Sequence, residues 1–170
     1  MTNFDQLATS RYSVRKYKAQ PVEAEKMAKI LEAGRIAPTA HNNQPQRIRV
    51  ITEAADLEKM DTCTRCRFGA PAALLVCYDK DAVWVRPFDS ANSGEVDASI
   101  VVTHLMMQAH DLGLGTCWVM YFDPAKTVEA FALPENIIPV AFLPLGYPAD
   151  DAEPSPKHAE RFPLDDLLLK

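Results

Sequence analysis

The spacing of apolar residues predicts helices and strands that follow one another along the chain. Apolar residues three or four positions apart are typical of helices, whereas alternating or short continuous apolar runs are typical of strands. On this basis we predict short helices at residues 3–10, 22–37, 54–63 and 124–133. We predict strands at residues 47–52, 71–80 and 138–148, and an extended segment at residues 116–123.

Residues 96–112 form the most apolar helical segment. Their sequence, VDASIVVTHLMMQAHDL, is apolar nearly all round, which predicts a buried central helix. Asp97 lies in the first turn, where a carboxylate complements the helix dipole. Gly113 and Gly115 are expected to end the helix. The GLG stretch follows a helix instead of a strand, so it is not a dinucleotide-binding fingerprint.

The composition indicates one globular domain over residues 1–170. The chain is 48% hydrophobic and 24% charged, which is ordinary for a domain with a sizeable core. Helices and strands alternate without a linker or an internal repeat, so we predict an α+β or α/β domain. The tail, from about residue 150 to residue 170, is rich in proline and charge but ends in three leucines, so we expect it to dock on the core or on a second chain.

The charge and the apolar runs exclude two classes of partner. A net charge of −5 argues against a nucleic-acid footprint, which needs clustered basic residues. The apolar runs fall well short of the roughly 20 residues that cross a bilayer, and the N-terminal residues lack the apolar core of a signal peptide. We therefore expect a cytoplasmic protein that binds neither nucleic acid nor membrane.

The cysteines and histidines do not predict a metal site. Cys63 and Cys66 form a single C-x-x-C pair, which is half of a four-thiolate zinc site. We interpret them as two incidental thiols, with a redox role or a metal bridge between chains as the alternative. Cys77 lies in an apolar strand and is expected to be buried and inert. The four histidines are scattered without ligand spacing.

Several polar clusters carry the candidate chemistry. The segment RYSVRKYK, residues 11–18, is too basic and too polar for a core. Arg161 lies near Lys157 and His158 at the far end of the chain, and the stretch APTAHNNQPQ, residues 37–46, holds many hydrogen-bonding side chains. Arginines can fork onto a phosphate, and amide side chains can match the edge of a ring. Together these clusters suit a ligand with an anionic end, a polyhydroxyl middle and a flat amide-bearing ring, such as flavin mononucleotide (FMN).

The chain resembles the nitroreductase family of flavin-dependent oxidoreductases almost from end to end. The resemblance rests on five motifs in the family's order, which are RYSVRKY, APTAHNNQPQ, GLGTCWVMYFDP, LPLGYP and HAERFPLDD. It implies a three-layer α+β fold with a mostly antiparallel central sheet flanked by helices. It also implies an intertwined homodimer with two FMN molecules at the interface.

The resemblance further implies which residues hold FMN. They are Arg11, Tyr12, Ser13, Arg15, Pro38, Thr39, Ala40, Asn42, Gln44, Cys117, Trp118, Val119, Met120 and Arg161. Arg11 and Arg161 would contact the phosphate with help from Ser13. Arg15 would lie at the N1 and C2 edge of the ring, where a guanidinium stabilises the anionic reduced form.

Other roles follow from the same resemblance. Pro38 to Asn42 would come from the partner chain, with Gln44 bracing that loop. The backbone N–H of Met120 would meet flavin N5 and is the only catalytic group that we assign. Three positions depart from the family's usual residues: Gln46 replaces Trp, Met120 replaces Gly, and Ala159 replaces a phosphate-binding Lys that Lys157 or His158 could substitute.

The implied activity is a ping-pong reduction. NADH or NADPH would deliver hydride to the flavin, and a small electron-poor acceptor such as a nitroaromatic or a quinone would then be reduced. Two alternatives remain at this point. One is a flavin dehydrogenase or dehalogenase with a specific substrate, and the other is a non-catalytic flavin carrier or redox sensor that uses Cys63 and Cys66.

Overall fold

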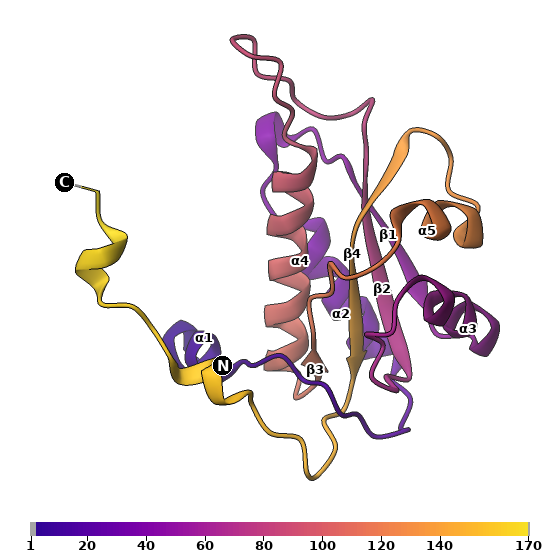
Figure 1. The fold of residues 1–170 in the computed structure, drawn as a ribbon, viewed down its shortest axis with the longest axis vertical. Coiled ribbons are helices and arrows are strands. Elements are labelled where there is room, and N and C mark those ends of the chain that lie inside the picture. The colour runs from indigo at the N-terminus through magenta and orange to yellow at the C-terminus, as the bar shows by residue number, and fades with distance from the viewer. Residues whose placement is uncertain (1–2, 170) are drawn as a thin grey trace.

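The computed structural model describes residues 3–169 and is built around an antiparallel sheet. Across the described residues the sheet has four strands in the order β1-β2-β4-β3 (Figure 1). The strands are β1 (Gln46–Ile51), β2 (Ala72–Asp79), β3 (Gly115–Thr116) and β4 (Ile137–Gly146). All three pairings are antiparallel. The α+β fold with an antiparallel sheet is therefore confirmed.

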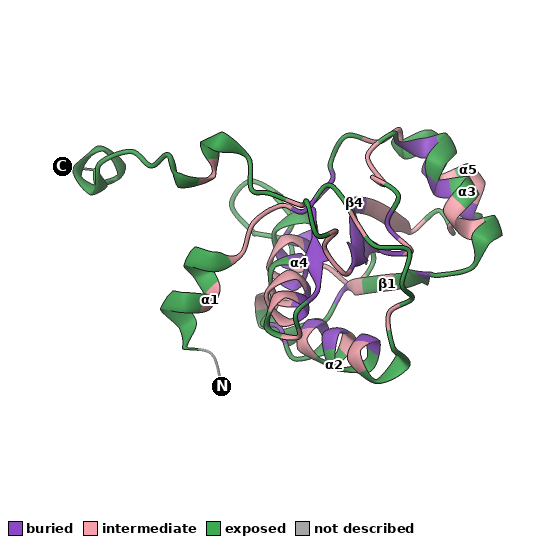
Figure 2. Cartoon of the chain, turned by 90° about the horizontal axis from the view of Figure 1, so that it is seen from below, coloured by how far each residue is buried: buried purple, intermediate pink, exposed green. Residues whose placement is uncertain are grey.

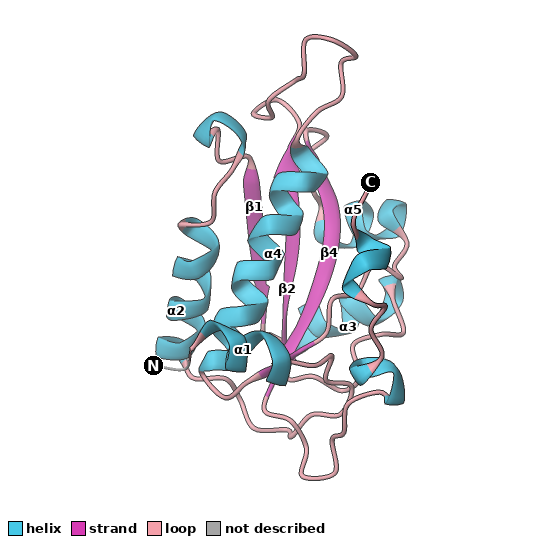
Figure 3. Cartoon of the chain, turned by 90° about the vertical axis from the view of Figure 1, so that its left-hand side faces the viewer, coloured by secondary structure: helices cyan, strands magenta, loops and turns pink. Residues whose placement is uncertain are grey.

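Helices cover both faces of the sheet, so the fold has three layers (Figure 3). One layer contains α2 (Ala24–Arg35) and α4 (Gly94–Asp111), and the other contains α3 (Ala54–Cys63) and α5 (Pro124–Phe131). The short helix α1 (Phe4–Ser10) lies beside α4. Three single-turn helices complete the described elements: η1 (Ala40–Asn42), η2 (Pro156–Ala159) and η3 (Leu164–Leu167).

Each face of the sheet has its own apolar core. Alternate residues of β2 enter the two cores, because successive side chains of a strand point to opposite faces. Leu74 and Val76 pack with α2 and α4, whereas Leu75 and Cys77 pack with α3 and α5. The continuous apolar run of β2 thus reflects a strand covered on both faces, as its sequence predicts.

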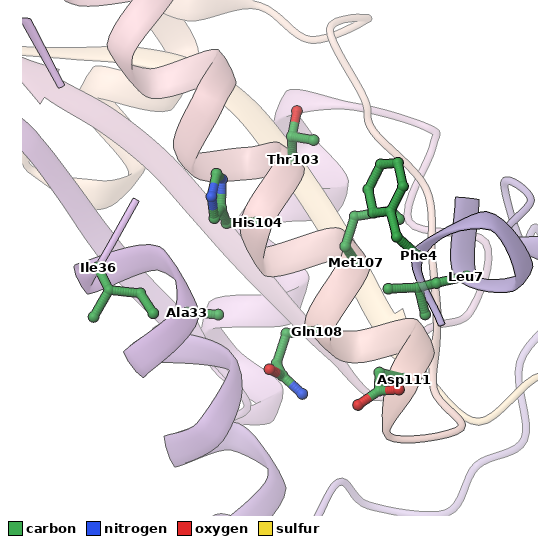
Figure 4. A pocket seen from close by; sticks show the side chains of 9 residues that line it. All are labelled: Phe4, Leu7, Ala33, Ile36, Thr103, His104, Met107, Gln108 and Asp111. Atoms are coloured by element: carbon green, nitrogen blue, oxygen red, sulfur yellow. The ribbon is translucent and has the colours of Figure 1, made fainter. Parts of the chain in front are cut away.

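The expectation of a buried central helix holds for only one side of α4 (Gly94–Asp111). One face of α4 is open, and Val96 in its first turn is 61% exposed. A groove of about 420 Å³ lies between α1, α2 and α4 (Figure 4), lined by Phe4, Leu7, Ala33, Ile36, Thr103, His104, Met107, Gln108 and Asp111. The apolar residues that made α4 look like an interior helix therefore include a face that this chain does not cover.

The basic segment at residues 11–18 was wrongly expected to stay out of the core. Val14 is only 2% exposed, and its N–H donates to the carbonyl of Thr116 at 2.9 Å. Gly115 makes this approach possible, because a Cβ atom there would lie 2.5 Å from Cγ2 of Val14. Gly115 thus does more than end a helix, whereas Gly113, with a φ of 77°, has the left-handed backbone of a helix stop.

The C-terminal segment extends away from the body of the chain. Figure 2 shows it as an exposed arm after β4. Its large apolar side chains are exposed: Phe162, Leu164, Leu167, Leu168 and Leu169. Docking of this tail on a partner chain stays a prediction. Within residues 3–169, no helix is long and apolar enough to cross a membrane.

Candidate functional site

Two of the predicted motifs lie side by side next to β3. Ser13 forms a parallel bridge with Thr116, directly before Cys117 and Trp118. The following residue, Val14, donates its N–H to the Thr116 carbonyl. Residues 11–15 and 116–119, which are about a hundred positions apart in the sequence, therefore form one continuous surface.

The cations of residues 11–18 fall into two groups. Lys16 and Lys18 are neutralised, because their amines lie 2.7 Å and 2.6 Å from carboxylates of Asp151 and Asp150. Arg11 and Arg15 form no ion pair with any described residue, and one Arg15 nitrogen donates to the Ser13 carbonyl at 3.2 Å. The two arginines therefore retain uncompensated charge that an anionic ligand could use.

A cavity of about 320 Å³ joins this surface to the C-terminal segment. It is lined by Tyr12, Ser13, Arg15, Ser155, Lys157 and His158. The hydroxyl of Tyr12 donates to the carbonyl of Ala152 at 3.2 Å, which fixes the two segments to each other. Lys157 and His158, which we considered as substitutes for the family's lysine, both line this cavity.

Arg161 does not line the cavity with Arg15, Lys157 and His158, and neither does Arg11. Its Nη1 donates to the carbonyls of His158 and Glu160 at 2.5 and 2.6 Å, so the guanidinium folds back on its own segment. The residue is exposed. Within this chain the structure thus does not bring Arg161 together with Arg11 at a shared anion site.

The backbone around Met120 presents a free N–H group. Val119 exchanges two hydrogen bonds with Phe142 of β4, and its carbonyl accepts the Phe142 N–H at 3.0 Å. In a trans peptide the C=O and the following N–H point in opposite directions, so the N–H of Met120 points away from β4. This N–H has no hydrogen-bond partner in residues 3–169, and the Met120 side chain is 70% exposed.

The polar stretch before β1 is held by a buried carboxylate. The N–H of Ala40 donates to Oδ1 of Asp97 at 2.9 Å, and the hydroxyl of Ser93 donates to Oδ2 at 2.7 Å. Asp97 is only 1% exposed. Sequence reasoning assigned Asp97 to the helix dipole alone and missed this anchor, because an acid in the first turn of a helix carries no sign of a distant backbone partner.

The rest of the stretch is a compact turn. The N–H of Gln44 donates to the Thr39 hydroxyl at 3.1 Å, and the Gln44 amide donates to the Asn42 carbonyl at 3.3 Å, so both groups of Gln44 bond within this turn. His41, Asn42 and Gln44 have φ values between 52° and 55°, a left-handed conformation that is uncommon for residues other than glycine. His41 also stacks on Trp84, with ring centroids 5.6 Å apart.

The two halves of the predicted site lie at opposite ends of α4. The stretch at Pro38 to Gln44 is anchored to Asp97 in the first turn, whereas Ser13 pairs with Thr116 beyond the last turn. At about 1.5 Å per residue, these ends are separated by roughly 25 Å. One chain therefore does not bring both halves of the predicted site to a single ligand.

Burial determines how reactive and how accessible three of the cysteine thiols are. Burial raises the pKa of the Cys117 thiol, and the positive charges of Arg15 and Arg11 oppose that rise only in part. Burial also raises the pKa of Cys77 to about 12, as expected for an inert thiol. Cys63 is buried and donates to the Lys59 carbonyl at 3.3 Å, which weighs against an accessible Cys63–Cys66 redox pair.

The donors on this surface suit a flavin phosphate better than a metal ion. No group of three metal-ligating side chains gathers anywhere in residues 3–169. The uncompensated guanidiniums of Arg11 and Arg15, together with Lys157 and His158, match the charge of a phosphate. The free N–H of Met120 matches an acceptor atom on a ring. These residues could therefore hold the two ends of FMN.

Comparison with known proteins places the chain in a family. The sequence profile of the Nitroreductase family matches residues 8–66 and 65–147. A protein of Methanothermobacter thermautotrophicus, provisionally named NADH dehydrogenase/NAD(P)H nitroreductase, is 32% identical over 156 residues, which cover 84% of this chain and 75% of that protein. This chain therefore belongs to the nitroreductase family.

Two further relatives support the assignment. The crystal structure of a nitroreductase family protein from Clostridium difficile 630 matches 99% of this chain and 98% of its own, with 44% identity and a TM-score of 0.93. The FMN reductase [NAD(P)H] of Bacillus subtilis is 29% identical over 170 residues, which cover 88% of this chain and 67% of that protein. The chain is thus similar to oxidoreductases over most of its length.

Proposed function

We propose that this protein is an FMN-dependent oxidoreductase that uses NADH or NADPH to reduce small electron-poor acceptors. The observation that carries the proposal is the surface formed by residues 11–15 and 116–120. It combines two arginines that form no ion pair within residues 3–169 with a backbone N–H that has no hydrogen-bond partner in the same part of the chain. Family membership and the name of the Bacillus subtilis relative support FMN and NAD(P)H as the groups involved.

The role of the protein in this reaction is to bind FMN, to orient it and to leave one side of its ring open to the substrates. FMN, when bound, supplies the hydride-accepting and hydride-donating chemistry. Arg11, Ser13 and Lys157 would hold the phosphate end, and the charge of Arg15 would favour an anionic edge of the ring by Coulomb attraction. The Met120 N–H would donate a hydrogen bond to the ring, and we assign no acidic or basic side chain to the cycle.

We also propose that the working form is a homodimer. Pro38, Thr39, Ala40 and Asn42 cannot reach the residues 11–15 of their own chain, because α4 separates them. A second copy would bring its 38–44 stretch to this surface, cover the open face of α4 and reposition Arg161 with the C-terminal tail. The exposed leucines of the tail and the apolar groove beside α4 both support this arrangement.

The first test is the retention of FMN. The purified protein is loaded with excess FMN, desalted and compared by visible absorption with the Arg11→Ala, Arg15→Ala double variant. We expect about one FMN per wild-type chain and a dissociation constant at least tenfold higher in the variant, because charge-assisted hydrogen bonds to the ligand are lost.

A charge-matched control distinguishes the loss of the proposed phosphate site from a general change in net charge. The Lys18→Ala, Lys29→Ala variant also removes two cations, but both come from exposed ion pairs with Asp150 and Glu25. It should retain FMN like the wild type. A wild-type protein that retains no flavin would refute the proposed function, and equal losses in both variants would refute the assigned phosphate site.

A further inference from the structure

The turn that follows α3 is bonded to the segment that carries Met120. The hydroxyl of Thr64 donates to the carbonyl of Tyr121 at 2.5 Å and accepts the N–H of Cys66 at 3.1 Å. Beside it, the N–H of Asp123 donates to the carbonyl of Cys63 at 3.0 Å. Thr64 is 5% exposed. Its hydroxyl therefore acts as both donor and acceptor and links two loops.

The Tyr121 carbonyl is one of a series of fixed peptide groups. The Val119 carbonyl accepts from Phe142, the Met120 carbonyl accepts the N–H of Phe122 at 3.0 Å, and the Tyr121 carbonyl accepts from Thr64. The bond from Phe122 to Met120 closes a three-residue turn centred on Tyr121. The strand anchors this turn on one side, and Thr64 anchors it on the other.

Beyond these bonds, the turn is held at its end by Phe122, whose ring packs edge-on against Phe142 with centroids 5.3 Å apart. Met120 and Tyr121 are 70% and 64% exposed, so their side chains contribute little packing. The Tyr121 ring faces the guanidinium of Arg65, 5.0 Å from the ring centroid, which is a further contact with the same loop. The Val119–Phe142 bonds and the Phe122 ring thus fix the two ends of the segment, and Thr64 is the side chain that bonds to the exposed part between them.

We propose that Thr64 is a positioning residue that aims the Met120 N–H at the ring of the bound cofactor. This inference rests on the proposed function, because it gives the free N–H of Met120 its role. Thr64 does not contact the cofactor. It fixes the carbonyl end of the turn, so that the N–H is held in one direction before the ligand arrives.

The test compares two threonines that lie two positions apart. Thr64→Val removes the hydroxyl at nearly constant volume, whereas Thr62→Val is the matched control, because the Thr62 hydroxyl contacts only α3, where it donates to the Lys59 carbonyl and lies 3.8 Å from the Cys63 sulfur. Thr64→Ser keeps the hydroxyl. Each variant is examined by FMN fluorescence quenching, by the visible spectrum of the bound flavin and by amide hydrogen exchange without FMN.

We expect Thr64→Val to raise the FMN dissociation constant about three- to tenfold and to shift the flavin spectrum toward that of free FMN. Amide exchange at Phe122 should accelerate at least tenfold in the absence of FMN, and Thr64→Ser should restore all three values. Thr62→Val should match the wild type. The thermal midpoint of each variant is measured separately, and a midpoint equal to that of the wild type excludes a general loss of stability as the cause of these changes.

The outcomes distinguish this inference from the proposed function. If the wild type binds FMN but Thr64→Val behaves like Thr62→Val, the role of Thr64 is wrong and the proposed function stands. If the wild type binds no FMN, both fail. If Thr64→Val does not fold, Thr64→Ser decides: a normal spectrum and normal exchange at Phe122 support the inference, and altered values in a stable protein overturn it.

Discussion

Single residues of the basic segment differ sharply in their electrostatic surroundings. Lys16 and Lys18 are paired with aspartates, whereas Arg11 lies close enough to His110 to act on it. Burial lowers the pKa of His110 first, and the charge of Arg11 lowers it further, against a smaller opposing effect of Asp111. The pKa of His110 is therefore a measure of the charge that Arg11 brings to the proposed phosphate site.

Replacing Arg11 by alanine should raise the pKa of His110 part of the way toward its ordinary value of about 6.5. The imidazole resonances of the ligand-free protein, followed by NMR as a function of pH, measure this shift. Lys18→Ala, in which a paired cation is removed, should leave the titration unchanged. An unmoved titration in Arg11→Ala would show that the arginine charge does not reach His110.

The same lowered pKa sets the sign of the pH dependence of stability. Well above a pH of about 6.5 the imidazole is neutral in both the folded and the unfolded chain, so the protein has its full stability with respect to this group. As the pH falls, the unfolded chain binds the proton first, and stability is lost through the folded pKa of His110. In Arg11→Ala this acid loss should be smaller, because the two pKa values lie closer together.

At the scale of elements, the regular helices and strands follow from local patterns. Helix α3 spans the predicted residues 54–63, and the run of apolar residues in β2 indicates a strand buried on both faces. Contacts between distant segments leave no such pattern. Val14 is one apolar residue in a basic segment, and nothing near it in the sequence indicates that it packs against Gly115.

In the candidate site, too, local motifs could be predicted from the sequence, whereas contacts between distant segments could not. The motif residues could be listed from the sequence, because the family resemblance names their positions. Asp97 and Thr64 could not, because each acts through a backbone group far away in the chain, and neither residue type is unusual where it stands. The open face of α4 was missed because apolar residues facing a groove look the same in sequence as apolar residues facing a core.

The packing of residues 11–18 on β3 should depend on Gly115. In Gly115→Ala the added methyl group would meet Val14 at 2.5 Å, and overpacking of this kind costs about 1–3 kcal/mol. We expect this loss in urea unfolding, together with faster tryptic cleavage at residues 11–18. Gly113→Ala is the control, because a Cβ atom there meets no atom of residues 3–169 within 4 Å.

Gly113→Ala should lower the free energy of unfolding by only about 1 kcal/mol, because alanine is strained in the left-handed backbone that Gly113 adopts. It should not expose residues 11–18 to trypsin. If Gly115→Ala were as stable and as resistant as the wild type, the close approach of Val14 to β3 would not be what holds the basic segment in place.

At the scale of the whole molecule, the proposed homodimer would make FMN binding and the association of two chains a single coupled equilibrium. Residues 11–15 and residues 38–44 of one chain lie at opposite ends of α4, and the α4 face between them is open. A ligand that needs both segments must take them from two chains. By linkage, whatever dissociates the chains should then release FMN.

A variant that places charge on the open face tests this linkage. Val96→Asp combined with Thr103→Asp alters two exposed positions of α4, and desolvating two carboxylates at an interface is strongly unfavourable. We expect the wild type to sediment as a dimer at micromolar concentration and the variant as a monomer. The variant should bind FMN at least tenfold more weakly, although Arg11, Arg15 and Met120 are intact.

The control places the same charges on the opposite layer. Ala55→Asp combined with Ala125→Asp alters exposed positions of α3 and α5, and it should remain a dimer with normal FMN affinity. A monomeric wild type that retains FMN would contradict the linkage, since one chain would then suffice. A monomeric variant that binds FMN normally would contradict it too, because residues 38–44 of a second chain would not be needed.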